Sequence, residues 1–177
     1  MATVTSPQQV FDDSFEVLME FEGYISDDAH DAGGLTKYGI SQRAYPDLDI
    51  ANLTLDDART IYKRDYFHAA HCHELPSMLA AHVFDTAVNM GTRRAIRFAQ
   101  RAVGAKPDGA FGPKTRAAVQ AACAHRGEAE VINDFQSYRA VFYAQLAARK
   151  PSQKKFLRGW MRRTYRLQQF LMSRAAS

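Results

Sequence analysis

The chain has 177 residues, a formal net charge of +4, 46% hydrophobic residues and 11% aromatic residues, values that are usual for a globular protein. Two cysteines, Cys72 and Cys123, are too few for a disulfide framework, so we expect two free thiols and a core that needs no disulfides. The sequence has no apolar run near the roughly 18 residues of a membrane-spanning helix, and residues 1–9 lack the basic and apolar regions of a signal peptide.

The first helix is predicted to begin after Ser6 and to end at Gly23. Ser6 is a good N-cap, Pro7 suits the first helical position, and Gln9 is placed to complete a capping box. Apolar residues then recur at helical spacing, which predicts a buried stripe along one face of this helix. The stripe consists of Val10, Phe11, Phe15, Val17, Leu18 and Phe21.

Residues 24–40 differ from the rest of the chain because they are rich in aspartate and glycine. Such residues favour turns, so this segment is predicted to hold a short hairpin, the only β structure expected. Caps and apolar spacing predict helices elsewhere, at about residues 54–67, 77–90, 92–103, 113–124 and 152–174. A further long helix, which ends before Pro151, is predicted to carry Val131, Phe135, Phe142 and Leu146 on one face. The predicted fold is therefore mainly α, with one small β-hairpin after the first helix.

Glu22 lies at the end of the buried stripe, in register with Phe15 and Leu18. A carboxyl group at this position should be partly desolvated, which raises its pKa and keeps a proton available at neutral pH. These are the properties of a general acid. Glu20 points about 200° away around the helix and is expected on the solvated face. The alternative is that Glu22 is only the last polar residue of the helix.

A second carboxylate, Asp31, follows nine residues after Glu22, and Thr36 follows five residues later. Hydrolysis of a glycosidic bond needs a protonated acid for the leaving oxygen and a carboxylate that activates water or stabilises the cationic sugar. Glu22 and Asp31 can supply these groups from two sides of a cleft, with the Thr36 hydroxyl holding the attacking water. The alternative is that Asp31 only forms a turn, because aspartate is common in loops.

The spacing of Glu22, Asp31 and Thr36 resembles the Glu/Asp/Thr arrangement of phage-type lysozymes. The likeness is stronger over residues 22–41, which resemble the signature of glycoside hydrolase family 108, a group of peptidoglycan-cleaving endolysins. This resemblance implies a lysozyme-like α+β fold and places the catalytic glutamate at Glu22. A Gly-Tyr pair and two prolines of that signature are replaced here by Tyr24, Ile25, Ala29 and Ala32.

The resemblance implies hydrolysis of the peptidoglycan glycan strand between N-acetylmuramic acid and N-acetylglucosamine, with no cofactor. In this interpretation Glu22 protonates the leaving oxygen, while Asp31, helped by Thr36, activates or positions water. Tyr38 is a candidate for stacking on a sugar ring, although an aromatic residue in a half-buried hairpin is more often a packing residue. The alternatives are a lytic transglycosylase that uses the same Glu22, and a non-catalytic helical protein that binds cell wall or DNA.

Stretches in the second half of the chain extend the resemblance to a predicted peptidoglycan-binding region of the same family. They are Asp85-Thr-Ala-Val-Asn-Met-Gly91, Asp108-Gly-Ala-Phe-Gly-Pro-Lys-Thr115, and Gly159-Trp160 with Arg163. We therefore expect Asp85, Asn89 and Trp160 to bind substrate, although the first two are equally suited to a structural role. The implied organisation is a catalytic lysozyme-like lobe at residues 1–90 and a helical peptidoglycan-binding lobe at residues 91–177, packed as one compact unit.

Charge is distributed unevenly, since residues 1–80 carry a net charge of −9 and residues 81–177 a net charge of +13. We expect the basic half to dock on the anionic wall of bacteria, and no nucleic acid to bind near Glu22, where the dense acidic residues would repel phosphates. The last helix carries a basic stripe, which is either an ordinary solvated face or a contact for anionic lipopolysaccharide of the outer membrane. This stripe consists of Lys155, Arg158, Arg162 and Arg166.

A metal-like cluster of residues occurs once in the sequence, at residues 68–74. It contains His68, His71, Cys72, His73 and Glu74. A zinc amidase would need further ligands from elsewhere in the chain, and a second cluster of such residues is missing from the sequence. We therefore expect these residues to cap or pack a helix end, and we predict no metal site.

The cellular location is predicted from the N-terminus. Without a signal peptide, the protein is expected to stay in the host cytoplasm until a holin releases it to the periplasm, as a phage lysis protein would. A secreted antibacterial effector would have the same sequence features. We expect a monomer.

Overall fold

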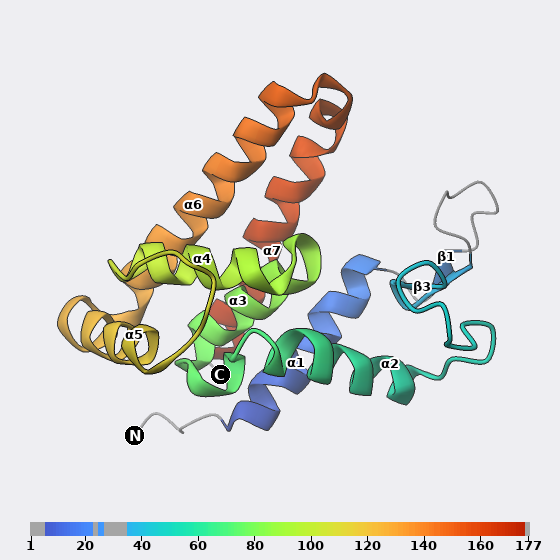
Figure 1. Cartoon of the computed structure of the whole chain (residues 1–177), viewed down its shortest axis with the longest axis horizontal. Helices are drawn as coiled ribbons and strands as arrows, with labels where there is room; N and C mark the ends of the chain where they lie inside the picture. Colours follow the sequence, from blue (N-terminus) through green and yellow to red (C-terminus); the bar gives the residue numbers. More distant parts are fainter. Residues whose placement is uncertain (1–5, 23–24, 27–34, 176–177) are drawn as a thin grey trace.

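The computed structural model describes residues 6–22, 25–26 and 35–175 (Figure 1). Most of these residues are helical, and a small antiparallel sheet follows the first helix, which confirms the predicted mainly α fold with one small β region. In chain order the elements are α1 (Pro7–Glu22), β1 (Ile25–Ser26), β2 (Thr36–Lys37), β3 (Ile40–Ser41), α2 (Leu55–Tyr62), η1 (Lys63–His68), η2 (Cys72–Glu74), α3 (Ser77–Met90), α4 (Thr92–Ala102), α5 (Pro113–Arg126), α6 (Glu128–Arg149), η3 (Pro151–Phe156) and α7 (Leu157–Ala175).

α1 begins and buries its apolar face as its sequence predicts. The Ser6 hydroxyl accepts a hydrogen bond from the Gln9 backbone N–H at 3.2 Å, which satisfies one of the N–H groups left unpaired in a first helical turn. The Gln9 side chain, predicted to complete a capping box, donates instead to Asp13 at 2.9 Å. The residues that α1 buries include Val10, Phe11, Phe15, Val17, Leu18 and Met19.

The β region is a three-stranded antiparallel sheet in the order β1–β2–β3, with two residues in each strand. Thr36 of β2 lies opposite Ser26 on one side and Ser41 on the other. Tyr38 and Gly39 form the turn between β2 and β3, with φ values of 52° and 76°. Positive φ at both positions suits a tight two-residue hairpin turn that matches the twist of the strands. The sheet therefore contains the predicted hairpin and one further strand.

α2 begins with a complete capping box, as the position of Thr54 predicts. The Thr54 hydroxyl accepts from the Asp57 N–H at 3.1 Å, and the Asp57 carboxylate accepts from the Thr54 N–H at 3.0 Å. The helix buries Ala58, Ile61 and Tyr62 and continues directly into the π-helical segment η1. Together α2 and η1 cover residues 55–68, close to the predicted range.

Single glycines join two pairs of helices at sharp turns of the chain. Gly91 alone separates α3 from α4, and Gly127 alone separates α5 from α6. Their φ values are 90° and 86°, a conformation that residues with a side chain rarely adopt. The sharp turns let α3 pack against α1, α4 and α6, and α3 is buried from Leu79 to Ala87.

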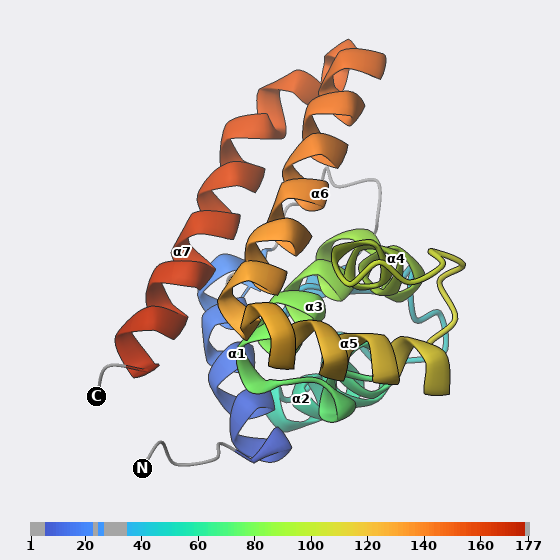
Figure 2. The ribbon, with the colours of Figure 1, turned by 90° about the vertical axis from the view of Figure 1, so that its left-hand side faces the viewer.

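α6 and α7 lie side by side and extend beyond the other helices, as Figure 2 shows. The predicted apolar face of α6 is partly wrong, because Phe142 and Leu146 are only half-buried. Helix packing instead turns a neighbouring set of positions inward, and this set includes an arginine. The buried residues of α6 are Val131, Ile132, Phe135, Arg139, Tyr143 and Ala147.

α7 buries Leu167 and Leu171 on one side and exposes Arg158, Arg162 and Arg166 on the other, while Lys155, the first residue of the predicted basic stripe, is exposed in η3. The chain enters this helix through η3, a 3-10 helical segment, so the regular α-helix begins later than the sequence predicts. Among the described helices, none combines the length and the apolar character needed to cross a membrane.

Candidate active site

Glu22, the predicted general acid, is the last residue of α1. The backbone places it four residues beyond the buried Leu18 and close to the sheet, whose first strand begins at Ile25 (Figure 1). The Glu22 side chain and the whole of Asp31 lie outside the described residues. The proposed pairing of the two carboxyl groups across a cleft therefore stays a prediction.

The sheet is attached to the same apolar stripe that leads to Glu22. Thr36 is half-buried in β2, and the half-buried Tyr38 follows in the turn. The Tyr62 hydroxyl of α2 donates a hydrogen bond to the Tyr38 carbonyl at 3.0 Å. The Tyr62 ring in turn meets the Phe15 ring of α1 edge-on, with centroids 5.7 Å apart. This chain of contacts holds the β2–β3 turn near the end of α1.

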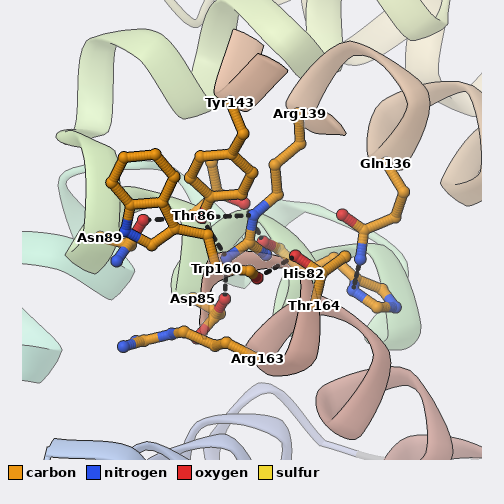
Figure 3. A network of polar contacts seen from close by, with 10 residues as sticks. All are labelled: His82, Asp85, Thr86, Asn89, Gln136, Arg139, Tyr143, Trp160, Arg163 and Thr164. Carbon is orange, nitrogen blue, oxygen red and sulfur yellow. Dashed lines mark hydrogen bonds and ion pairs between the residues drawn. The ribbon is translucent and has the colours of Figure 1, made fainter. Parts of the chain in front are cut away.

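Asp85, a predicted substrate-binding residue, lies in the protein interior on α3, with 3% of its surface exposed. Arg163 Nε donates to its Oδ1 at 2.8 Å, and Arg139 Nη2 lies 2.6 Å from its Oδ2 (Figure 3). Burial alone would raise the pKa of Asp85, but the two guanidinium groups hold that pKa below its usual value. Asp85 is therefore an internal anion that joins α3 to α6 and α7.

Asn89 and Trp160, also predicted to bind substrate, belong to the same network. The Tyr143 hydroxyl accepts from Arg139 Nε at 3.3 Å and donates to Asn89 Oδ1 at 2.7 Å. The Trp160 ring stacks on the Tyr143 ring, with centroids 4.9 Å apart and planes inclined by 14° (Figure 3). Asn89 is exposed and Trp160 is half-buried, so both side chains reach the surface from a rigid base. Their contact with substrate stays a prediction.

His82 extends this network into the core, one turn before Asp85 on α3. Gln136 Nε2 donates to His82 Nδ1 at 2.8 Å, and the Thr86 hydroxyl donates to the His82 carbonyl at 2.8 Å. Burial, reinforced by the charge of Arg139, lowers the pKa of His82 to about 4. The imidazole is therefore neutral at pH 7 and accepts the hydrogen bond from Gln136.

Arg139, Tyr143 and His82 are members of this network that the sequence did not predict. One signal was present, because Arg139 follows Phe135 by four residues and so falls on a predicted apolar face. An arginine at a buried position needs an anionic partner, and Asp85 is the acidic residue of the predicted helix at 77–90. The distance of 54 residues between them left their pairing open.

The loop that joins α4 to α5 is organised by Gln100, which is 1% exposed. Its side-chain N–H groups donate to Asp108 Oδ1 at 2.8 Å and to Thr115 Oγ1 at 3.1 Å, while its Oε1 accepts from the Gly109 N–H at 2.9 Å. Gly109 has a φ of 79°, and an added Cβ would lie 2.6 Å from Arg93 Cγ. The contacts of Asp108 and Gly109 within the protein therefore account for the Asp-Gly motif of this loop.

Two family models match the chain in succession. Residues 15–91 match the model described as Glycosyl hydrolase 108, and residues 94–165 match the model described as Predicted Peptidoglycan domain. The two matches follow one another along the chain in this order. This confirms the family resemblance of residues 22–41 and supports a glycosidase whose substrate is peptidoglycan. We refer to the two matched ranges as the hydrolase region and the peptidoglycan region.

The solved structure of Brucella abortus SagA is similar to this chain over nearly its full length. The two chains share 26% sequence identity with a TM-score of 0.77, and the match covers 96% of this chain and 95% of the SagA chain. This similarity supports the lysozyme-like α+β fold class. No curated protein sequence matches the chain significantly.

The buried network crosses from one region to the other. His82, Asp85 and Asn89 belong to the hydrolase region. The residues that they contact belong to the peptidoglycan region, and they are Gln136, Arg139, Tyr143 and Arg163. Three predicted site residues, Asp85, Asn89 and Trp160, therefore lie together at this junction, whereas Thr36 and Tyr38 lie in the sheet.

Proposed function

We propose that this protein is a muramidase that hydrolyses the glycan strand of peptidoglycan between N-acetylmuramic acid and N-acetylglucosamine. The observation that carries the proposal is the match of residues 15–91 to glycosyl hydrolase 108, because this range contains the end of α1 and the sheet. Glu22 donates its proton to the glycosidic oxygen as the bond to the anomeric carbon breaks. Asp31, with Thr36, activates or positions the water that adds to that carbon.

The packing of α1 supports Glu22 as the proton donor. Phe15 and Leu18 precede it by seven and four residues and are 3% and 1% exposed. Residues at these spacings share one helix face, so Glu22 occupies a position on the apolar face of the helix. An apolar surrounding raises the pKa of a carboxyl group and keeps it protonated at neutral pH. Glu20, two residues earlier, is exposed and provides a matched control.

The decisive experiment compares Glu22→Gln with Glu20→Gln in a lysis assay on permeabilised Gram-negative cells. We expect Glu22→Gln to lower the lysis rate at least about a hundredfold, the scale of general acid catalysis, and Glu20→Gln to leave it nearly unchanged. Circular dichroism and thermal unfolding verify that both variants fold. Retained lysis by a folded Glu22→Gln variant would contradict the assignment.

Mass spectrometry of the products tests the type of reaction. Hydrolysis leaves reducing N-acetylmuramic acid ends, whereas a lytic transglycosylase that uses the same Glu22 leaves 1,6-anhydro ends. We expect reducing ends. Binding to purified wall without any cleavage would favour the third hypothesis, a non-catalytic wall-binding protein.

Wall binding is the second part of this proposal, with Asn89 and Trp160 at the junction and Tyr38 in the β2–β3 turn as the contacting residues. Asp85 takes part from inside the protein, where it binds Arg139 and Arg163. The half-buried Trp160 ring, fixed by stacking on Tyr143, suits contact with a sugar face. In a Glu22→Gln background, Trp160→Ala should weaken cosedimentation with sacculi about threefold to tenfold, as expected when one aromatic contact is lost. The control is Tyr165→Ala, because Tyr165 is 67% exposed on the same helix. Equal effects would remove Trp160 from the proposed site.

The exposed stripe of α7 is proposed to contact anionic lipopolysaccharide. The four residues of the stripe are all exposed along η3 and α7, and they are Lys155, Arg158, Arg162 and Arg166. Their joint replacement by glutamine should lower binding to lipopolysaccharide at low salt, and the difference should shrink at high salt because exposed charges are screened. A difference that is independent of salt would contradict an electrostatic contact.

We propose a biological role as a phage lysis protein that is released from the host cytoplasm to the periplasm by a holin and acts as a monomer. Expression in a bacterial host should then cause lysis only with a co-expressed holin. Lysis without a holin would contradict this part of the proposal. Size-exclusion chromatography with light scattering tests the monomer, for which we expect a mass near 19.9 kDa.

A further inference from the structure

A second group of chemically active side chains lies after η1, at the end of α2 that is farther from the sheet (Figure 1). His71, His73 and Glu74 each offer one donor atom here, and these atoms all lie within 4.8 Å of one another. The chain brings them together because His71 has a left-handed backbone, with a φ of 56°, and η2 turns tightly after it. From the sequence, these residues are expected only to cap or pack a helix end. That role does not explain why their donor atoms converge.

Glu74 stands at the centre of the group. Its Oε1 lies 2.8 Å from His71 Nδ1 and 3.7 Å from His73 Nε2, so one carboxylate oxygen faces both rings. The other oxygen, Oε2, forms an ion pair with Arg116 of α5. This pair fixes the carboxylate plane and leaves Oε1 directed at the two imidazoles.

Each imidazole is also held in place from outside the group. The His71 ring stacks on the Phe111 ring, with centroids 4.8 Å apart and planes inclined by 15°. His73 Nδ1 lies 3.2 Å from His68 Nδ1, within hydrogen-bond distance. When His73 donates its Nδ1 proton to His68, the lone pair of His73 Nε2 is left facing Glu74. An outer hydrogen bond of this kind is how proteins commonly orient a metal-binding histidine.

We propose that His71, His73 and Glu74 bind one divalent metal ion of borderline softness, such as Zn²⁺, with water in the remaining coordination positions. Two imidazole nitrogens and one carboxylate oxygen form a donor set that suits Zn²⁺ better than the all-oxygen sets preferred by Mg²⁺ and Ca²⁺. The ion takes the place of the proton between His71 Nδ1 and Glu74 Oε1. As that proton leaves Nδ1 for solvent, Nε2 of the same ring takes one up from solvent, so His71 binds the ion as a neutral imidazole.

A metal ion at this site would strengthen the contact between the two regions. Its three ligands belong to the hydrolase region, whereas Phe111 and Arg116, which hold two of these ligands, belong to the peptidoglycan region. Binding to the folded chain should therefore raise its resistance to unfolding, since an ion that binds only the native state stabilises it. This inference is independent of the catalytic role proposed for Glu22.

Isothermal titration of Zn²⁺ into the full chain tests the site directly. A Cys123→Ser background is used because Cys123 is a half-buried free thiol that could bind Zn²⁺ by itself. We expect one ion per chain, and an affinity that falls at least about tenfold in His73→Gln, since even outer-shell partners of a metal contribute about 10–100-fold. His68→Gln keeps all three ligands and should weaken binding less than His73→Gln does.

The matched control is His125→Gln, because His125 is an exposed histidine on α5 away from the group. It should leave both the stoichiometry and the affinity unchanged. Thermal unfolding gives an independent readout, in which Zn²⁺ raises the Tm of the parent by a few degrees but not that of Glu74→Gln. Circular dichroism without Zn²⁺ verifies that the variants fold. The proposal is overturned by an absence of binding, by binding that survives His73→Gln, or by binding that His125→Gln removes.

Discussion

The hydrolase and peptidoglycan regions meet at two junctions, each made by ion pairs of the same chemistry but in different surroundings. At the buried junction, Asp85 is bound by Arg139 and Arg163, and the side chains of the Asp85–Arg139 pair are 5% and 0% exposed. At the exposed junction, Glu74 is paired with Arg116, and these side chains are 19% and 44% exposed. An acid of the first region meets an arginine of the second in both cases, so solvent exposure is the variable that differs.

Exposure decides what each pair contributes. Inside the protein, removal of one partner leaves a charge that has lost its water, which is strongly unfavourable. At the surface, water replaces the missing partner at little cost. The comparison predicts that the buried junction holds the two regions together, whereas the exposed junction mainly orients side chains.

The largest effect is expected for Asp85→Ala. This change leaves Arg139 buried without its anion and should lower the free energy of unfolding by about 3–5 kcal/mol, measured by urea denaturation. The control is Asp134→Ala, which breaks an exposed pair with Arg126 whose side chains are 39% and 47% exposed. In that variant the free energy of unfolding should fall by less than about 1 kcal/mol. Similar losses in the two variants would refute the distinction.

The buried junction should also make stability depend on pH. The folded protein lowers the pKa of His82 from 6.5 to about 4, so protonation favours the unfolded chain. The contribution of neutral His82 to the free energy of unfolding should be fully present above pH 6.5. It should fall by on the order of 3 kcal/mol as the pH drops toward 4. Denaturation at both ends of this range, in wild type and in His82→Gln, measures the difference. The variant should lose most of this pH dependence, and an unchanged slope would argue against His82 as its source.

A smaller loss is expected for Tyr143→Phe. The change removes a hydroxyl that accepts from Arg139 and donates to Asn89, while the ring that stacks on Trp160 remains. We expect the free energy of unfolding to fall by about 1–2 kcal/mol, the usual cost of leaving a buried polar group without its partner. Tyr138→Phe, on the same helix and 37% exposed, is the matched control and should change stability little. Equal stability of Tyr143→Phe and wild type would show that Arg139 finds other partners.

The smallest effect is expected for Arg116→Gln at the exposed junction. Because Arg116 is 44% exposed, loss of its pair with Glu74 should cost no more than about 1 kcal/mol in the absence of metal. Thermal unfolding in a chelating buffer measures this change. A loss as large as that of Asp85→Ala would mean that exposure is not the variable that separates the two junctions.

Parts of the candidate site could be predicted because they depend on local periodicity. The spacing of Phe15, Leu18 and Glu22 placed the carboxyl-bearing residue at the end of a buried helix face, and the structure buries the first two. Tyr38 and Thr36 were placed correctly in the β region. The partners of Asp85 could not be predicted, because Arg139 and Arg163 lie 54 and 78 residues away. The spacing of Arg139 from Phe135 marks it as a buried position, but nothing in the sequence identifies Asp85 as the partner of either arginine.

The sequence by itself determined several helix boundaries and caps, such as the capping box at Thr54 and the turn at Gly91, because these depend on hydrogen bonds and φ angles within a few residues. Only the tertiary structure decided which charged groups are buried together and which imidazoles converge. Those choices depend on how α3 packs against α6 and α7, and on where α5 meets η2. Contacts between helices distant in the sequence are set by packing of whole faces, which no short stretch of residues specifies.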